Sequence, residues 1–336
     1  MMRLPYFRYR PARTVREAAE WLAASPADTM LVAGGTDLLP NMKRRQQVPA
    51  TLVGLRQIGE LKHISNGDGV RIGAGLTLTE LLRDPKTRGY GALRQAAAQV
   101  ATPHLRNMGT LGGNLCLDTR CNYYDQNYEW RKAIDFCMKK DGDTCWVATS
   151  SPTCLAVSST DTAPALMALG ARVTLVSADS SREIAVADLY RNDGIHYLTR
   201  RPDELLTEIR LPRLDGWRST YWKLRRRGSF DFPVLSVAAA ARFASDGTVT
   251  DARLVIGAVA SCPIEAGDAA SVLAGHPLTD ARIADAAERA AVHAKPMDNT
   301  DFTLHWRKKM ARAFVTNALR ELRGDDVSEL RRKMSR

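Results

Sequence analysis

"LVAGGTDLLP", residues 31–40, couples an apolar run to a pair of glycines and decides how the first half of the chain is interpreted. The apolar run predicts a buried strand that turns sharply at the glycines. Because Gly34 and Gly35 carry no side chain, the backbone there can approach a bulky ligand closely. The amides from Gly34 to Leu38 then predict an anion nest for a pyrophosphate, with the Thr36 hydroxyl as a further donor. The segment matches neither Walker A nor GxGxxG, so a plain strand-to-helix turn is the alternative.

A second glycine-rich loop, "RNMGTLGGNL" at 106–115, repeats this chemistry. Its small residues and side-chain donors are Gly109, Thr110, Gly112, Gly113 and Asn114. Two such loops, well separated in the sequence, predict that one extended dinucleotide lies between them.

The order of the predicted elements divides the chain near residue 215. Strand and helix patterns alternate up to the strand "DELLTEIRLP", residues 203–212. Beyond it, strand patterns come first and alanine-rich helix patterns follow. The strands are expected at 219–227, 235–243 and 252–260, and the helices at 280–294 and 306–323. Strands followed by helices predict an α+β domain.

The composition is that of a soluble globular protein with an excess of positive charge. Hydrophobic residues make up 45% and charged residues 25% of the 336 residues, which suits two or three domains with sizeable cores. No apolar run suits a signal peptide or a membrane span, so a cytoplasmic protein is expected. The net charge of +11 fits a solvated basic face or an acidic partner, and no nucleic-acid-binding motif accompanies it.

Four of the six cysteines gather in one polar, aromatic-rich stretch, at Cys121, Cys137, Cys145 and Cys154. In the cytoplasm thiols stay reduced, so metal binding is favoured over disulfides. The spacing lacks a C-x2-C knuckle and matches neither common zinc patterns nor ferredoxin runs. From spacing alone, an iron–sulfur cluster and a zinc ion are equally open, and unrelated cysteines are a third alternative. Cys116 and Cys262 are interpreted as structural.

Five segments in a fixed order resemble the FAD-binding subunit of the xanthine dehydrogenase family of molybdenum hydroxylases. They are "LVAGGTDLLP", "IGAGLTLTELL", "RNMGTLGGNL", "SSTDTAPALMAL" and "FDFPVLSVAAA". The resemblance implies an FAD-binding domain of the p-cresol methylhydroxylase type, with two subdomains, over 1–215. A smaller α+β domain of the CO dehydrogenase flavoprotein type is implied over 216–325, followed by a basic tail at 326–336.

The same resemblance implies which residues bind FAD. They are Leu31, Val32, Ala33, Gly34, Gly35, Thr36, Asp37, Leu38, Thr102, His104, Asn107, Gly109, Thr110, Leu111, Gly112, Gly113, Asn114, Asp161 and Lys223. The two glycine loops would face the pyrophosphate, and Asp161 would lie near the ribityl or adenosine part. Lys223 is the candidate for reaching the isoalloxazine, with a rim lysine in water as the alternative. His104 has a loop-anchoring role as its alternative, and no catalytic residue is expected.

The cysteine-bearing insertion at about 117–157 resembles the β subunit of 4-hydroxybenzoyl-CoA reductase. That resemblance implies a [4Fe–4S] cluster on Cys121, Cys137, Cys145 and Cys154. It further implies electron flow from ferredoxin through the cluster and FAD to a partner's [2Fe–2S] centres. A molybdenum subunit would then reduce 4-hydroxybenzoyl-CoA to benzoyl-CoA, in an (αβγ)2 heterohexamer.

Three alternatives remain open beside this interpretation. The first is the FAD subunit of a NAD- or quinone-linked molybdenum hydroxylase of the CO dehydrogenase or xanthine dehydrogenase type. The others are a stand-alone FAD oxidoreductase and a zinc-stabilised binding module.

Overall fold

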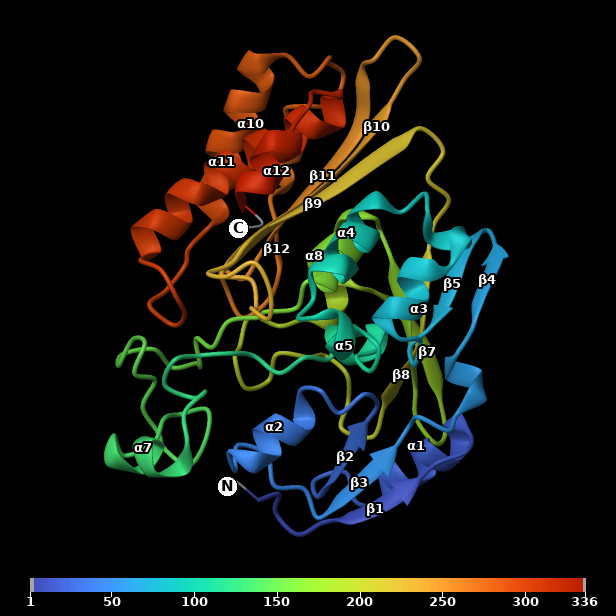
Figure 1. Ribbon diagram of the computed structural model, residues 1–336, viewed down its shortest axis with the longest axis vertical. Helices are drawn as coiled ribbons and strands as arrows, with labels where there is room; N and C mark the ends of the chain where they lie inside the picture. The colour runs from blue at the N-terminus through green and yellow to red at the C-terminus, as the bar shows by residue number, and fades with distance from the viewer. Residues whose placement is uncertain (1–2, 335–336) are drawn as a thin grey trace.

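The computed structural model describes residues 3–334, which form three sheets and their covering helices (Figure 1). The first sheet is parallel, with the strand order β1-β3-β2. Its elements are β1 (Arg8–Pro11), α1 (Val15–Ala24), β2 (Thr29–Val32), α2 (Leu38–Lys43) and β3 (Thr51–Gly54). Thr14 caps α1 by accepting a hydrogen bond from the Glu17 amide. The Glu17 carboxylate accepts from the amide of Arg13 rather than of Thr14, so the two residues do not form a reciprocal capping box.

The second sheet is antiparallel, with the order β4-β5-β8-β6-β7. Its strands are β4 (Ile64–Gly67), β5 (Gly69–Gly73), β6 (Arg172–Val176), β7 (Ser181–Ala185) and β8 (Leu205–Leu211). Its helices are α3 (Leu78–Arg83), α4 (Gly91–Gln99), α5 (Pro103–Arg106), α6 (Leu111–Leu115) and α8 (Thr162–Ala168), with short 3-10 turns at Gly59–Leu61, Pro85–Thr87 and Ala187–Leu189. Because β8 pairs with β5, the long segment between them belongs to this same unit.

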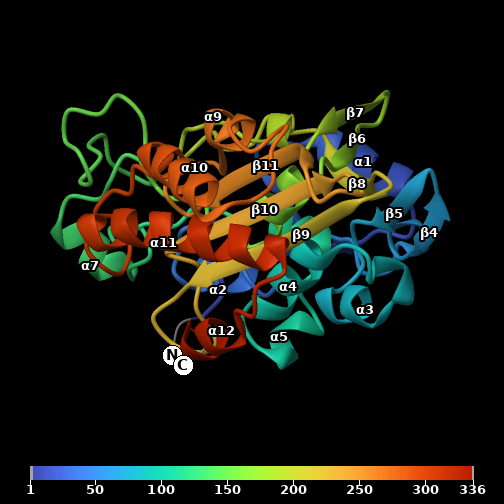
Figure 2. The ribbon, with the colours of Figure 1, turned by 90° about the horizontal axis from the view of Figure 1, so that it is seen from above.

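The third sheet has the order β12-β11-β10-β9 and lies between two helical layers. Its elements are β9 (Trp217–Leu224), β10 (Leu235–Phe243), β11 (Val249–Gly257), β12 (Ile264–Glu265), α9 (Gly267–Ser271), α10 (Asp280–His293), α11 (Leu304–Arg323) and α12 (Ser328–Met334). Along β10, Val237 and Ala239 pack in the core with α10 and α11, which Figure 2 shows across this sheet. The alternate residues Ala238 and Ala240 pack in the core that contains α4 and α8. The period-two pattern of β10 thus joins the two units.

The insertion extends from the body of the protein and carries one short helix, α7 (Tyr128–Ala133) (Figure 1). A pair of backbone hydrogen bonds between Arg120 and Val157, of 2.8 and 2.7 Å, closes its base. Arg131 of α7 is fully buried and donates to the carbonyls of Arg44 and Arg45. These contacts hold the insertion against α2.

The structure confirms the predicted α+β class. No helix within residues 3–334 combines the length and the apolar character needed to cross a membrane.

Candidate flavin and cysteine sites

A cavity of about 660 Å³ lies where the two glycine loops meet. The predicted flavin residues on its wall are Leu31, Val32, Ala33, Gly34, Gly35, Thr36, Asp37, Leu38, Gly109, Thr110, Gly112, Gly113, Asn114 and Asp161. Thr102, His104, Asn107, Leu111 and Lys223 are not part of the wall. The segments 195–198 and 230–232 complete the cavity.

The first glycine loop offers unused hydrogen-bond donors to this cavity. Within residues 3–334, none of the backbone N–H groups from Gly34 to Leu38 donates a hydrogen bond. Gly35 has a φ of 70°, in the left-handed region that favours glycine, and this turn directs the loop around the cavity. Free amides on a cavity wall need acceptors, which the oxygens of a diphosphate supply. The loop therefore fits the pyrophosphate of FAD.

The second glycine loop contributes shape rather than amides. The amides of Leu111 and Gly112 each donate to a carbonyl of the segment after β5, at 2.9 Å, and the amide of Gly113 donates to the Thr110 hydroxyl at 3.0 Å. A Cβ on Gly34 would lie 2.0 Å from the carbonyl oxygen of Met108, so the two loops are in direct contact. Glycine is required at Gly34 for this close approach.

Arg120 is a residue of this site that the sequence did not indicate. Its guanidinium forms an ion pair with Asp37 and donates to the side chain of Asn41 at 3.1 Å. A carboxylate on a pyrophosphate site would repel the ligand, and the charge of Arg120 compensates Asp37. The buried Nε of Arg120 has no partner within residues 3–334. No signal marked Arg120, because it stands outside both glycine motifs.

Asp161 connects the cavity to the C-terminal domain. Lys223 of β9 lies 3.0 Å from its carboxylate, and the Tyr221 hydroxyl donates to it at 2.8 Å. Burial raises the pKa of Asp161 and lowers that of Lys223, and the attraction between the two charges opposes both shifts. The side chain of Lys223 is fully buried, which excludes a rim lysine in water. Its contact with the isoalloxazine stays a prediction, since Lys223 lies behind Asp161.

The remaining predicted residues organise the loops. The side-chain oxygen of Asn114 accepts from the Thr160 hydroxyl and from both the amide and the hydroxyl of Thr162, so it ties α6 to α8. The five predicted residues away from the wall divide as follows. Thr102 caps α5, Asn107 accepts from Thr79, Leu111 is buried, His104 is exposed and Lys223 pairs with Asp161.

The four cysteines of the insertion are all buried, with 5–7% of each residue exposed. Burial, helped by the neighbouring Cys154 and Cys137, raises the pKa of Cys121 to about 12, although the amides of Tyr123 and Tyr124 oppose the rise. Burial likewise raises the pKa of Cys154 to about 11. Its sulfur accepts the Ala156 amide at 3.4 Å. The fold therefore buries these four thiols and supplies an N–H donor to the sulfur of Cys154.

The backbone around the cysteines is closely fitted. A Cβ on Gly194 would lie 2.7 Å from the sulfur of Cys154, so only glycine suits this position. Beside Cys137, Asp135, Phe136 and Asp141 have φ values of 58°, 59° and 69°. Such a conformation is unfavourable for residues with a side chain and persists only where the surroundings hold it. The loops are therefore shaped to present the thiols.

A zinc ion and a [4Fe–4S] cluster require different arrangements of their ligands. No group of three or more His, Cys, Asp or Glu side chains in residues 3–334 could hold a metal ion. Zinc ligands must all reach one centre at about 2.0–2.3 Å, and the zinc alternative stays open beside the cluster. A [4Fe–4S] cluster takes one thiolate on each of its irons, so its ligands stand farther apart. Cys116 instead lines the flavin cavity, and Cys262 lies half-buried.

The aromatic residues of the insertion divide into two groups by their burial. Tyr124 is buried in their cluster and Tyr123 packs against it. Trp130 and Trp146 are 39% and 37% exposed, so they do not seal the site.

Fold and cavity define a flavoprotein in which a two-part binding unit is covered by a second domain. Residues 5–214 match the model of the "FAD binding domain in molybdopterin dehydrogenase", and residues 219–322 match the "CO dehydrogenase flavoprotein C-terminal domain". The chain belongs to this family of FAD-binding subunits of molybdenum hydroxylases.

Individual relatives agree with this assignment. The chain is 34% identical over 276 residues to the aldehyde oxidoreductase FAD-binding subunit PaoB of Escherichia coli, covering 78% of this chain and 85% of the relative. It is 29% identical over 318 residues to the carbon monoxide dehydrogenase medium chain of Afipia carboxidovorans, covering 93% and 95%. The solved carbon monoxide dehydrogenase from Hydrogenophaga pseudoflava superposes with a TM-score of 0.78 at 25% identity, covering 96% and 98%. Neither family description includes an iron–sulfur cluster, so the cluster stays a prediction.

Proposed function

We propose that this chain is the electron-transfer subunit of a molybdenum enzyme, with FAD between the glycine loops and a [4Fe–4S] cluster on Cys121, Cys137, Cys145 and Cys154. The observation that carries the proposal is the burial of four cysteines from one insertion, with the Ala156 amide donating to the sulfur of Cys154. Hydrogen bonds to the sulfurs and limited solvent access are the protein's means of setting a cluster's potential.

The chain works with partners in this proposal. Relatives are named as medium chains and subunits, and one solved relative is described as a Cu,Mo-CO dehydrogenase. A molybdenum subunit carries out the substrate chemistry, and a [2Fe–2S] subunit connects it to the flavin, in a heterohexamer of (αβγ)2 form. This chain binds the flavin, orients it and excludes water from it.

Two candidate reactions place the cluster at opposite ends of the electron path. In the first, a ferredoxin delivers electrons at the cysteine site, and the partner removes the phenolic hydroxyl of 4-hydroxybenzoyl-CoA. The insertion favours this candidate through its resemblance to the reductase. In the second, the partner oxidises an aldehyde and electrons leave through this chain. The identity of 34% to an aldehyde oxidoreductase subunit favours the second candidate.

Cluster binding is tested with two cysteine variants of the complex, purified without oxygen. Cys137→Ser removes a buried member of the group, whereas Cys262→Ser changes a half-buried cysteine of the C-terminal domain. We expect the first variant to lose about four irons per chain and to keep FAD, and the second to keep both. Equal iron loss in the two variants, or zinc in place of iron in the parent protein, would contradict the proposal.

The reaction is tested separately with the intact complex. Reduction of an artificial acceptor by aromatic or aliphatic aldehydes would support the oxidative candidate. Benzoyl-CoA formed from 4-hydroxybenzoyl-CoA with reduced ferredoxin would support the reductive one.

A further inference from the structure

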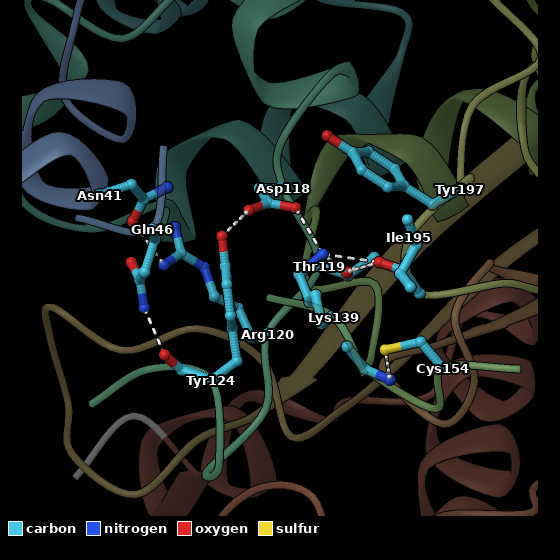
Figure 3. Close-up of polar contacts among 12 residues, drawn as sticks. Asn41, Gln46, Asp118, Thr119, Arg120, Tyr124, Lys139, Cys154, Ile195 and Tyr197 are labelled. Atoms are coloured by element: carbon cyan, nitrogen blue, oxygen red, sulfur yellow. Dashed lines mark hydrogen bonds and ion pairs between the residues drawn. The ribbon is translucent and has the colours of Figure 1, made fainter. Parts of the chain in front are cut away.

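Lys139 of the insertion points back to the wall of the flavin cavity. Its ammonium donates to the Asp118 carboxylate at 2.8 Å, the Thr119 hydroxyl at 2.7 Å and the Gly194 carbonyl at 2.6 Å (Figure 3). An ammonium group has three donors, so all of them are used. The side chains of Lys139 and Asp118 are each only 6% exposed. This is a buried, fully bonded cation in a chain segment made mostly of polar surface.

The neighbours of Lys139 belong to the two sites. Asp118 and Tyr197 line the flavin cavity, and the ammonium lies 5.5 Å from the centre of the Tyr197 ring. On the other side, Gly194 packs directly on the sulfur of Cys154. Lys139 therefore lies between the cavity and the thiols, and it is hydrogen-bonded to the residue that packs on the sulfur of Cys154.

The carboxylate of Asp118 is also shared between the sites. Its second oxygen accepts from the hydroxyl of Tyr124 at 3.0 Å and from Gln47 at 3.2 Å. Tyr124 packs among the cysteines, and Gln47 lines the cavity. An ordered pair of opposite charges thus spans the wall, with the positive end in the insertion and the negative end on the cavity.

We propose that Lys139 is a positioning residue that sets the reduction potential of the cluster relative to the flavin. The inference rests on the proposed function, because it requires a cluster on the four cysteines. A cluster held there would gain one negative charge on one-electron reduction, whether ferredoxin or the reduced flavin is oxidised to supply the electron. The buried charge of Lys139 stabilises that added charge, and the burial of the pair limits screening by water. Lys139 thereby favours the reduced cluster, while Asp118 opposes it.

A purely structural role for Lys139 gives a different expectation. If the lysine only fixed the insertion to the cavity wall, loss of either partner would loosen the same contact. Both variants would then change the cluster in the same way. The electrostatic role instead requires opposite shifts, because one variant removes a positive charge and the other a negative charge.

The test is a potentiometric titration of the complex, purified without oxygen and followed by low-temperature EPR. Lys139→Gln should lower the midpoint potential of the cluster, with about a tenfold change in the ratio of reduced to oxidised cluster, or about 59 mV for one electron. Asp118→Asn should raise it. Lys139→Arg should keep the parent potential. Lys140→Gln is the matched control, because the Lys140 side chain is 34% exposed and pairs with Asp141 at the surface.

The outcomes separate the two proposals. A parent complex without a cluster signal overturns the proposed function and this inference with it. A cluster whose potential is the same in the Lys139→Gln and Lys140→Gln variants overturns the inference alone, as do shifts of equal sign in the Lys139→Gln and Asp118→Asn variants. If the Lys139→Gln variant does not hold the cluster, the midpoint potential of the Asp118→Asn variant tests the inference instead. A raised potential then supports the inference, and an unchanged or lowered potential overturns it.

Discussion

Adding one methyl group at Gly34 should weaken flavin binding without unfolding the protein. A Cβ there would lie 2.0 Å from the Met108 oxygen and 3.0 Å from the Gly109 nitrogen, both in the backbone of the second loop. The loops must move apart by more than about 1 Å to restore ordinary contacts. Overpacking of this kind costs about 1–3 kcal/mol. If that cost falls on the arrangement that binds the pyrophosphate, FAD affinity drops about 5- to 150-fold.

The assay is FAD titration of apoprotein by flavin fluorescence, with thermal unfolding measured on the same samples. Gly59→Ala is the matched control, since a Cβ on Gly59 meets nothing within 4 Å. Gly35 is a poorer choice for the test because its φ of 70° adds backbone strain to any substitution. Equal affinity for FAD in the Gly34→Ala and Gly59→Ala variants would refute the assignment of the two loops.

Two further predictions concern charged residues. Arg120→Met should weaken FAD binding about tenfold or more, because it leaves the Asp37 carboxylate uncompensated at the pyrophosphate, and adding Asp37→Asn should restore part of the affinity in the same titration. Burial raises the pKa of Glu204, but hydrogen bonds from Arg182 and the Arg201 amide outweigh it, and the pKa lies below its usual value. Its stabilisation is complete above the unfolded value of about 4.3 and is lost as the pH falls through the folded value. The melting temperature of the parent protein should therefore exceed that of Glu204→Gln near neutral pH, with a difference that shrinks on acidification; a constant difference would contradict this.

The glycine loops could be predicted because a close approach of two backbone segments requires glycine, which is visible in the local sequence. Gly34 and Gly112 each have backbone or Cβ atoms in the space of a side chain. Which of the two loops offers free amides to the cavity could not be predicted. The amides of Leu111 and Gly112 are used by the segment after β5, a pairing that only the folded chain brings about.

Elements at the edges escaped prediction for a related reason. All four residues of β1 are exposed, so the strand has no buried face to produce an alternating pattern. The short helix α2 was not predicted either, since it has only six residues and Pro40 lies inside it. The strands β10 and β11 carry long apolar runs, and for this reason both strands could be predicted from the sequence.

The buried charged residues are the most important residues of the site that the sequence did not predict. Arg120 and Lys139 stand in polar segments where charged residues are ordinarily solvated. Their burial depends on partners distant in the sequence, Asp37 and Gly194 among them. The cysteines, by contrast, could be grouped from the sequence because four of six occur within one short segment.

The most direct test of the central claim is low-temperature EPR of the complex, purified without oxygen and reduced, together with its iron and flavin content. We expect one FAD and the signal of a [4Fe–4S] cluster for each copy of this chain, in addition to the signals of the partner's [2Fe–2S] centres. About four irons per copy should remain after the partner's iron is subtracted. A complex with full flavin content, [2Fe–2S] signals alone and no further iron would contradict the account.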